Sequence, residues 1–247
     1  SRRPRRFIAP PVSPSGMATA SAPGKVYLFG EHAVVYGEPA VPCAIDRRAT
    51  VTVERREDPR VRIEAPALSL DAVTIEIGDG PPRVEVAPER VETAVRYVHA
   101  AIDRARDAAD APDAGFDVTV RSDLPIGAGL GSSAAVTVAA IDAATRACGV
   151  TLDREDLADH AYRVEHDVQG GQASRADTFC SAVGGAVRVE GGDCRSIEAP
   201  ELAFVVGYDG GAGDTGELVA GVRELREEYG FAADAVTAIG DLVRTGE

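Results

Sequence analysis

The sequence predicts an α+β fold, and three observations predict it. Residues 18–78 hold several short β-rich segments broken by Gly, Pro and Asp. Residues 91–102 and 153–167 carry apolar side chains at helical spacing. Between these helices, a half-buried strand at 116–120 leads through a glycine-rich turn into an Ala-rich segment at 134–148, which is typical of a buried helix.

Each element of the first 170 residues rests on its own pattern. The strands expected from alternation are Val26–Phe29, Ala49–Glu54, Arg60–Glu64, Val73–Ile77 and Phe116–Val120. The first helix places Val91, Val95, Val98 and Ile102 on one face. The helix from Asp153 to Asp167 does the same with Leu157, Ala161, Val164 and Val168.

The rest of the chain is expected to continue with a polar loop at 170–178, a Gly184-Gly185 turn and a strand at 186–190. A break near Pro200 begins a second unit. The unit opens with a buried-strand candidate at 202–207.

Two helices complete this second unit. Asp214 and Glu217 resemble a capping box at the start of the first helix. Its apolar stripe consists of Leu218, Val222, Leu225 and Tyr229. Residues 232–243 form the second helix. A unit of this size is too small to build a core of its own, so we expect it to be cut short.

Composition excludes several classes of function. The apolar content of 45% suffices for a core, while a net charge of −14 and a pI near 4.8 argue against nucleic acid or an anionic membrane as partner. No apolar run is long enough to span a bilayer, and no secretory signal is visible. The four Cys form no Cys-x-x-Cys pair, which favours reduced thiols in a cytoplasmic protein.

The basic residues are unusual, because Lys25 is the only Lys among 26 Lys and Arg residues. Arg bias with high acidity is typical of proteins from salt-loving archaea, whose acidic surfaces keep them dissolved in concentrated salt. A GC-rich genome would produce the same bias, and both explanations can hold. Residues 1–16 carry four Arg, four Pro and no acid. We expect residues 1–17 to be a disordered leader, with Met17 as the true start.

The glycine-rich turn, Gly127–Ala135, is the first candidate functional motif. Three glycines let the backbone approach a ligand closely, and the N-terminus of the following helix favours an anion. The turn lacks the Lys of a Walker A loop, the third Gly of the dinucleotide fingerprint and the Gly-x-Ser-x-Gly order of a nucleophile elbow. A phosphate-binding loop of another kind is therefore the functional reading, and a tight turn before a helix is the structural one.

The second motif is Ala22–Gly37, which holds a cation, a carboxylate and an imidazole in Lys25, Glu31 and His32. A lone triplet of this kind is often surface charge beside a hydrogen-bonded His. Here it includes the only Lys of an Arg-rich chain, and Lys is a compact donor with a tunable pKa.

Together the two motifs resemble the GHMP kinases. They read Ala-Pro-Gly-Lys-x-x-Leu-Phe-Gly-Glu-His-Ala-Val-Val-Tyr-Gly and Pro-Ile-Gly-Ala-Gly-Leu-Gly-Ser-Ser-Ala-Ala. The sequence after Glu31-His32 is similar to the branch that phosphorylates mevalonate, whereas galactokinases have a Gly-Glu-His-Thr-Asp type of sequence there. The resemblance covers residues 21–230 and implies a two-domain fold. A ribosomal-protein-S5-like α/β domain is expected at 18–199, and an incomplete ferredoxin-like α+β domain at 200–247.

The resemblance also implies an activity, the transfer of the γ-phosphoryl group of ATP to the primary hydroxyl of mevalonate. It further implies Mg²⁺ as cofactor and a homodimer as the oligomeric state. The expected ATP-binding residues are Pro125, Gly127, Ala128, Gly129, Leu130, Gly131, Ser132, Ser133 and Ala134. Ser133 and Glu165 are expected to bind the metal. Asp177 and Lys25 are expected to be catalytic, and both are expected to contact the substrate together with Glu31 and His32.

Three departures from the family pattern keep alternatives open. Arg175 stands where the family has a Gly, and the loop between Glu165 and Asp177 is about one residue longer than usual. A third, glycine-rich motif is absent after Gly216, so we expect either a fragment or a gene that has lost this part. The alternatives to a mevalonate-phosphorylating enzyme are another GHMP kinase, acting on phosphomevalonate or a sugar, and a truncated nucleotide-binding remnant without activity.

Overall fold

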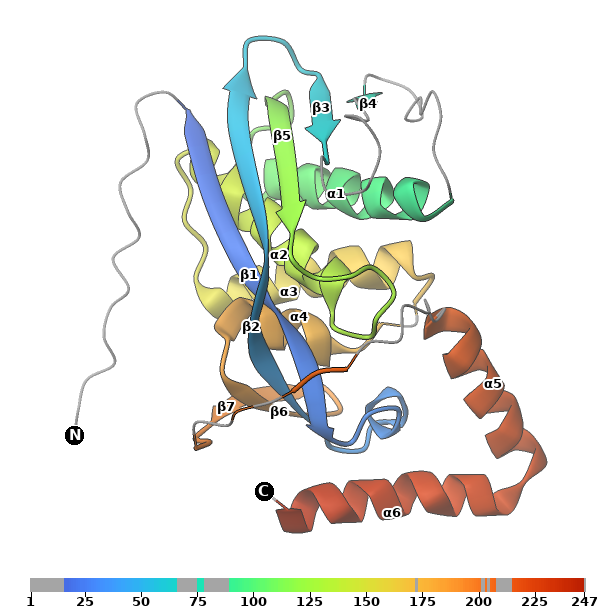
Figure 1. Ribbon diagram of the computed structural model, residues 1–247. Helices are drawn as coiled ribbons and strands as arrows, with labels where there is room; N and C mark the ends of the chain where they lie inside the picture. The colour runs from blue at the N-terminus through green and yellow to red at the C-terminus, as the bar shows by residue number, and fades with distance from the viewer. Residues whose placement is uncertain are drawn as a thin grey trace.

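A computed structural model of the chain describes residues 16–65, 75–77, 89–171, 173–200, 203, 205–207 and 215–246. Within these residues, one mixed sheet is covered on one face by helices, and two further helices lie beyond its lower end (Figure 1). Most of the predicted leader lies outside the described residues.

The sheet is built around one long strand, β2. Its strands are β1 Met17–Phe29, β2 Val41–Arg56, β3 Val61–Glu64, β4 Ile75–Ile77, β5 Gly115–Ser122, β6 Ala186–Glu190 and β7 Asp193–Ile197. In the described residues the order is β4-β3-β5-β2-β6-β7, with β1 paired to β2. The N-terminal part of β2 pairs with β6 and its C-terminal part with β5, while β1 follows it along both. Only the β3–β5 pair is parallel among these pairings.

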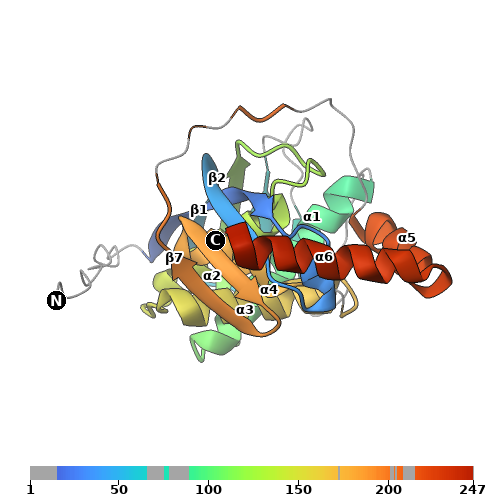
Figure 2. The ribbon, with the colours of Figure 1, turned by 90° about the horizontal axis from the view of Figure 1, so that it is seen from below.

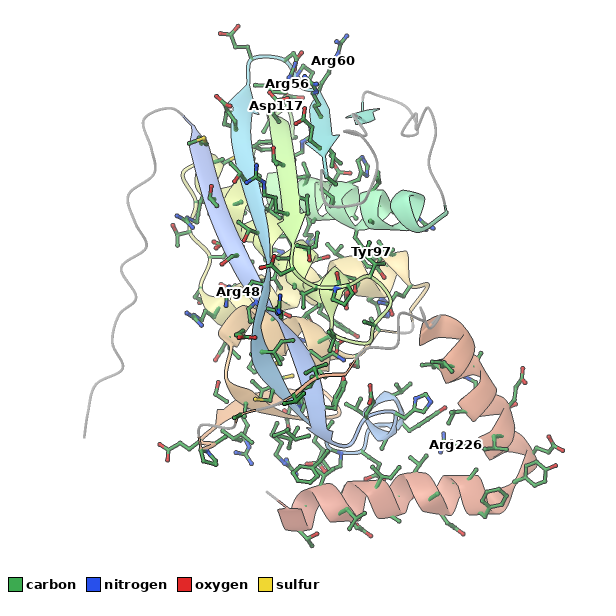
Figure 3. All side chains as sticks on the ribbon, viewed as in Figure 1. Arg48, Arg56, Arg60, Tyr97, Asp117 and Arg226 are labelled. Carbon is green, nitrogen blue, oxygen red and sulfur yellow. The ribbon has the colours of Figure 1, made fainter. Side chains whose placement is uncertain are left out.

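The helices that cover the sheet belong to one layer (Figure 2). They are α1 Glu89–Ala108, α2 Ser132–Ala147, α3 Arg154–Val168 and α4 Arg175–Val183. The alternation of the strands sets which face they cover, because Val51 and Val53 are fully buried whereas Thr50 and Thr52, which alternate with them, are not. The opposite face of the sheet carries polar side chains such as Arg48 (Figure 3).

Helix α2 lies at the centre of the core. Most of its residues are buried, because it packs on β1 and β2 as well as on α1, α3 and α4. Its many Ala side chains allow this close approach, and larger side chains such as Ile141 fill the remaining space. The packing fixes the N-terminus of α2 beside β1, which is where the glycine-rich turn lies.

Most elements expected from periodicity are confirmed. All five predicted strands before residue 121 are present, although residues 73–74 lie outside the described part of the chain. The helices expected at 91–102, 134–148, 153–167 and 232–243 correspond to α1, α2, α3 and a later helix, α6 Gly230–Gly246. Their predicted faces are buried at Val95, Val98, Ile102, Leu157, Ala161 and Val164.

The loop expected at 170–178 is wrong in its second half. Helix α4 begins at Arg175, with Ser174 as its N-cap, so Asp177 lies in the first turn of a helix. The Ser174 hydroxyl accepts a hydrogen bond from the backbone N–H of Ala176, which stabilises this helix start. The helix fixes the Asp177 backbone more firmly than a loop would.

One prediction for the second unit is also wrong. The described residues at 203 and 205–207 form no strand, and Val205 is fully exposed. Helix α5 Thr215–Glu228 is present, but Leu218 and Leu225 of its apolar stripe are 62% and 42% exposed. Val219, on a different face of the helix, is buried instead. The Asp214 cap lies outside the described residues.

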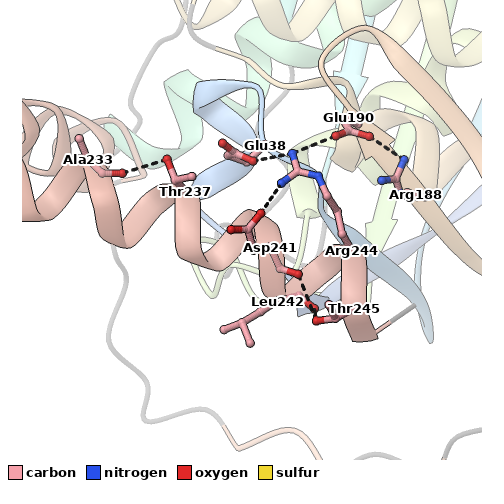
Figure 4. A network of polar contacts seen from close by, with 9 residues as sticks. All are labelled: Glu38, Arg188, Glu190, Ala233, Thr237, Asp241, Leu242, Arg244 and Thr245. Carbon is pink, nitrogen blue, oxygen red and sulfur yellow. Dashed lines mark hydrogen bonds and ion pairs between the residues drawn. The ribbon is translucent and has the colours of Figure 1, made fainter.

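Helix α6 Gly230–Gly246 packs against η1 Ala33–Tyr36, the short 3₁₀ helix that follows β1. Arg244 donates hydrogen bonds to Glu38 at 2.8 Å and to Glu190 at 3.1 Å (Figure 4). Gly240 permits this approach, since a Cβ there would lie 2.0 Å from the Glu38 Oε2 atom. The network ties the end of the described chain to the β1–β2 connection.

Replacing Gly115 with Ala should destabilise the sheet by about 2 kcal/mol, because the new Cβ would overlap the backbone. An ideal Cβ at Gly115 would lie 1.7 Å from the Asp58 carbonyl oxygen, and backbone atoms cannot rotate away. Urea unfolding would measure the loss. Gly192→Ala is the matched control, because no atom lies within 4 Å of its Cβ position. Equal stability of the two variants would contradict the prediction.

Candidate functional site

The glycine-rich turn between β5 and α2 forms one wall of the site. Gly127, Gly129 and Gly131 all have left-handed backbone conformations, with φ of 73°, 72° and 68°. Such φ values are strained for residues with a Cβ, so the turn needs glycine at these positions. The structure describes no hydrogen bond donated by the backbone N–H groups of residues 127–131. The turn therefore offers these N–H groups, with those of the first turn of α2, to an anion.

Lys25 joins β1 to this turn. Its backbone N–H donates to the Leu130 carbonyl oxygen at 2.9 Å, and its Nζ atom donates to the Gly129 carbonyl oxygen at 3.0 Å. The side chain is only 4% exposed, and a Cβ on Gly131 would lie 3.0 Å from its Cγ atom. Lys25 therefore lies directly under the glycine turn, as a buried cation.

Asp177 lies on the other side of Lys25. The Asp177 Oδ2 atom is 3.3 Å from the Lys25 Nζ atom, and the Tyr27 hydroxyl donates to the Oδ1 atom at 2.9 Å. The Asp177 side chain is 27% exposed. The carboxylate is thus held from two sides by strand β1 while part of it stays open to a ligand.

Ser133 and Glu165 form the deepest part of the site. The Ser133 hydroxyl, in the first turn of α2, donates to the Glu165 Oε1 atom at 2.7 Å. Glu165 belongs to α3 and is only 3% exposed. Its second carboxylate oxygen has no hydrogen-bond partner among the described residues.

The charges of the site act on one another. Burial raises the pKa of the Glu165 carboxyl to about 7, and the negative charge of Asp177 adds to the rise. The hydrogen bond from Ser133 and the charge of Lys25 oppose it. Burial and the charge of Glu165 also raise the pKa of the Tyr97 phenol on α1. The site therefore holds more negative charge than its single cation balances.

This donor set fits a hard divalent cation. A hydroxyl and a carboxylate are oxygen ligands, and Mg²⁺ at phosphate-transfer sites takes one or two carboxylates and completes its shell with phosphate oxygens and water. The described residues contain no group of three or more His, Cys, Asp or Glu side chains placed to hold a metal ion by themselves. The geometry at Ser133 and Glu165 is therefore that of a partial site, which a nucleotide would complete.

Glu31 and His32 lie apart from this constellation. They follow the end of β1, where Glu31 is exposed and His32 has φ of 71° as the residue before η1. In the described part of the chain, no hydrogen bond or ion pair joins either side chain to Lys25 or Asp177. The negative charge of Glu31 does contribute to a raised pKa at the Tyr27 phenol, so its carboxylate lies near the site.

Sequence reasoning missed two tyrosines. Tyr27 lies two residues after Lys25 on the same strand, so the period of a strand places both on one face. That signal was available. Tyr97 lies in α1 next to Glu165 and was hidden among the apolar positions of its helix.

Arg175, which stands where the family pattern has a Gly, fits the backbone without strain. Arg175 is the first residue of α4, forms an ion pair with Asp159 of α3 and lies 4.5 Å above the centroid of the Tyr162 ring. Since the backbone there is helical, a glycine is not required. The start of α4, and with it Asp177, is therefore anchored to α3.

Comparison with known proteins relates this geometry to a family. Residues 96–185 match the model of the GHMP kinases N terminal domain, and residues 11–55 match the galactokinase galactose-binding signature. The mevalonate kinase of Thermococcus gammatolerans is 42% identical over 209 residues, which are 85% of this chain and 62% of that enzyme. The mevalonate kinase of Thermococcus sibiricus is 41% identical over 225 residues, or 91% of this chain and 67% of the enzyme.

Solved structures show the same fold. The mevalonate kinase of Methanococcus jannaschii superposes with a TM-score of 0.69 at 24% identity, covering 92% of this chain and 71% of that one. The chain thus spans between 62% and 71% of the length of these three proteins.

Proposed function

We propose, because this chain belongs to the GHMP kinase family and to its mevalonate kinase branch, that it transfers the γ-phosphoryl group of ATP to the primary hydroxyl of mevalonate. One observation carries the proposal beyond the likeness in sequence. The buried Lys25 lies beneath a glycine turn at a helix N-terminus and pairs with the partly exposed Asp177, so a cation and a proton acceptor lie beside a cradle for phosphate.

The residues divide the chemistry between them. The turn from Gly127 to Ser133 binds the phosphates of ATP through backbone N–H groups. Asp177 orients the acceptor hydroxyl and takes its proton while the new oxygen–phosphorus bond forms and the bond to the β-phosphate oxygen breaks, which releases ADP. Lys25 stabilises the negative charge on the attacking oxygen. Because the transition state is loose, this placement matters more than the strength of the base.

Ser133 and Glu165 are the proposed ligands of Mg²⁺. When bound, the ion neutralises phosphate charge and fixes the phosphates relative to the acceptor. The excess negative charge of Glu165 and Asp177 over Lys25 favours a cation at this point. Glu31 and His32, at the exposed end of β1, are proposed to contact the hydroxyl or carboxylate groups of mevalonate.

The domain division at residue 200 and a homodimer are also proposed. The site residues all precede residue 200, which agrees with a catalytic N-terminal unit at 18–199. Light scattering at micromolar protein would distinguish the dimer from the monomer.

The match of residues 11–55 to a galactose-binding signature favours a second candidate, a sugar kinase. An ADP-release assay on the chain in molar salt decides between the two when run with mevalonate, 5-phosphomevalonate and galactose. Turnover with mevalonate above the blank without acceptor supports the proposal. Turnover with galactose alone would identify the chain as a sugar kinase. ATP binding without turnover on any acceptor would indicate a nucleotide-binding remnant.

Replacing Ser133 with Ala should raise the Mg²⁺ concentration for half-maximal rate about tenfold, which corresponds to about 1.4 kcal/mol for the lost ligand. The change removes the hydroxyl that contacts Glu165 and leaves the backbone of α2 unchanged. Titrating Mg²⁺ at saturating ATP measures the effect. Ser196→Ala on the exposed strand β7 is the control. An unchanged Mg²⁺ requirement would exclude Ser133 as a ligand.

A further inference from the structure

We infer that Tyr27 is a positioning residue, which fixes the orientation of the Asp177 carboxylate through its phenol. The inference rests on the proposed function, because it concerns the residue that receives the proton. It adds to the Lys25–Asp177 pair a third member, on the same strand as Lys25.

The geometry of the three side chains supports this role. The Tyr27 hydroxyl bonds to Oδ1 of Asp177 at 2.9 Å, while Lys25 contacts Oδ2 at 3.3 Å. The Lys25 Nζ atom also lies 4.2 Å from the centroid of the Tyr27 ring, within the range of a cation–π contact. Each oxygen of the carboxylate therefore has its own partner, and the two partners contact each other.

An ammonium group alone would not fix the carboxylate. Its charge attracts both oxygens with little directional preference, and the distance of 3.3 Å is long for a charge-assisted hydrogen bond. A phenol has one O–H, and its direction is set by the ring. The Tyr27 bond therefore restricts the rotation of the carboxylate and leaves its remaining lone pairs for the acceptor hydroxyl.

The ring itself is held by both parts that it joins. Tyr27 is paired with Pro42 across the β1–β2 ladder and packs against a buried cluster that includes Val34 of η1 and Phe179 of α4. Helix α4 also carries Asp177. The phenol and the carboxylate therefore belong to two elements that pack together, and their relative position is fixed.

The phenol acts as a donor and not as a base. Burial, and next the negative charge of Asp177, raise the pKa of Tyr27 well above its ordinary value. The O–H group stays protonated at every pH at which the chain would work. Tyr27 can then orient Asp177 but cannot take the proton from the acceptor.

Replacing Tyr27 with Phe tests the inference, because the ring and its packing remain and only the hydroxyl is lost. We expect kcat with mevalonate to fall about tenfold, while KM for ATP and for mevalonate change less than about twofold. Tyr162→Phe is the matched control, since it removes a phenol that stacks on Arg175 and does not contact Asp177. An unchanged kcat in Tyr27→Phe, beside an active unmutated chain, overturns the inference and leaves the proposed function intact.

A second readout does not depend on activity. Urea unfolding is measured for Tyr27→Phe, Asp177→Ala and the double variant. We expect Tyr27→Phe to lower the unfolding midpoint in the unmutated chain and to have no further effect once Asp177 is Ala. Additive losses would mean that the phenol does not hold the carboxylate, and would overturn the inference. If the unmutated chain is inactive with every acceptor, the proposed function fails, and this cycle still decides whether Tyr27 positions Asp177.

Discussion

Asp177→Asn should lower kcat with mevalonate by a factor of about 10² to 10⁴, the range that a general base contributes. Asn has nearly the volume of Asp and can still accept the hydrogen bond from the Tyr27 hydroxyl, so the packing of α4 is kept. What is lost is the group that accepts a proton, together with the charge that pairs with Lys25 at 3.3 Å.

Affinity for ATP should change less than about threefold, because the glycine turn and Ser133 are untouched and Asp177 acts on the acceptor. Coupled ADP release gives kcat, and calorimetry gives the ATP affinity. Asp117→Asn is the control, since Asp117 forms a comparable ion pair with Arg56 at the far end of β5 (Figure 3). A variant that keeps more than a third of the unmutated kcat would show that Asp177 is not the base.

The contrast between α3 and α4 shows what the sequence can predict about this fold. Helix α3 packs on the core with one face only. Its buried residues Leu157, Ala161 and Val164 therefore recur at helical spacing, which predicts the helix. Helix α4 has only nine residues and follows a glycine pair, and it buries the polar Thr178 and Ser181 as well as Ala176, Phe179 and Cys180. In a helix so short, with polar residues among the buried ones, the spacing of apolar residues alone does not predict a helix.

Two strand segments could not be predicted either, because their extended conformation depends on pairing with other strands. The first half of β2 shows no clean alternation, since its first two residues are both buried and Asp46, Arg47 and Arg48 are all exposed, although it pairs with β1 and β6. Strand β7 was not predicted, since Asp193–Ile197 is polar and pairs only with β6 among the described strands. In both segments the pairing partner, and not the local pattern, decides that the chain is extended.

The candidate site was predicted in its parts but not in its contacts. The motifs indicated Lys25 and the glycine turn, and the family resemblance added Ser133, Glu165 and Asp177. The structure brings these five features together, while no hydrogen bond or ion pair among the described residues joins Glu31 or His32 to them. Strand periodicity places Tyr27 on the same face as Lys25, but its contact with Asp177 could not be predicted, because Asp177 lies 150 residues away and is reached only when α4 packs on β1.

Glu165 should make the stability of the chain depend on pH. Its pKa is about 7 in the folded chain, against an ordinary value of 4.5, so the folded state binds the proton more tightly than the unfolded state does. The stability is then highest below about pH 4.5 and falls as the pH rises through 7, where the buried carboxyl must ionise beside Asp177.

Glu165→Gln should remove this dependence, because Gln resembles the protonated carboxyl and does not titrate. Between pH 5 and pH 8, we expect the free energy of unfolding of the unmutated chain to fall by about 3 kcal/mol relative to the variant. Urea unfolding in a chelator at fixed salt measures this difference. Glu155→Gln, an exposed position in the first turn of the same helix, is the control and should follow the unmutated chain.

The same experiment with Mg²⁺ tests the proposed metal site. A bound cation next to Glu165 would favour the ionised carboxylate, so millimolar Mg²⁺ with a nucleotide should reduce the loss of stability at pH 8 in the unmutated chain and not in Glu165→Gln. If, in chelator, the free energy of unfolding changed with pH equally in the unmutated chain and in Glu165→Gln, the environment of the Glu165 carboxyl would not oppose its ionisation. Equal Mg²⁺ effects on both would mean that the ion is bound elsewhere. Only a buried carboxyl that also binds the metal gives both a pH-dependent loss in chelator and its recovery with Mg²⁺.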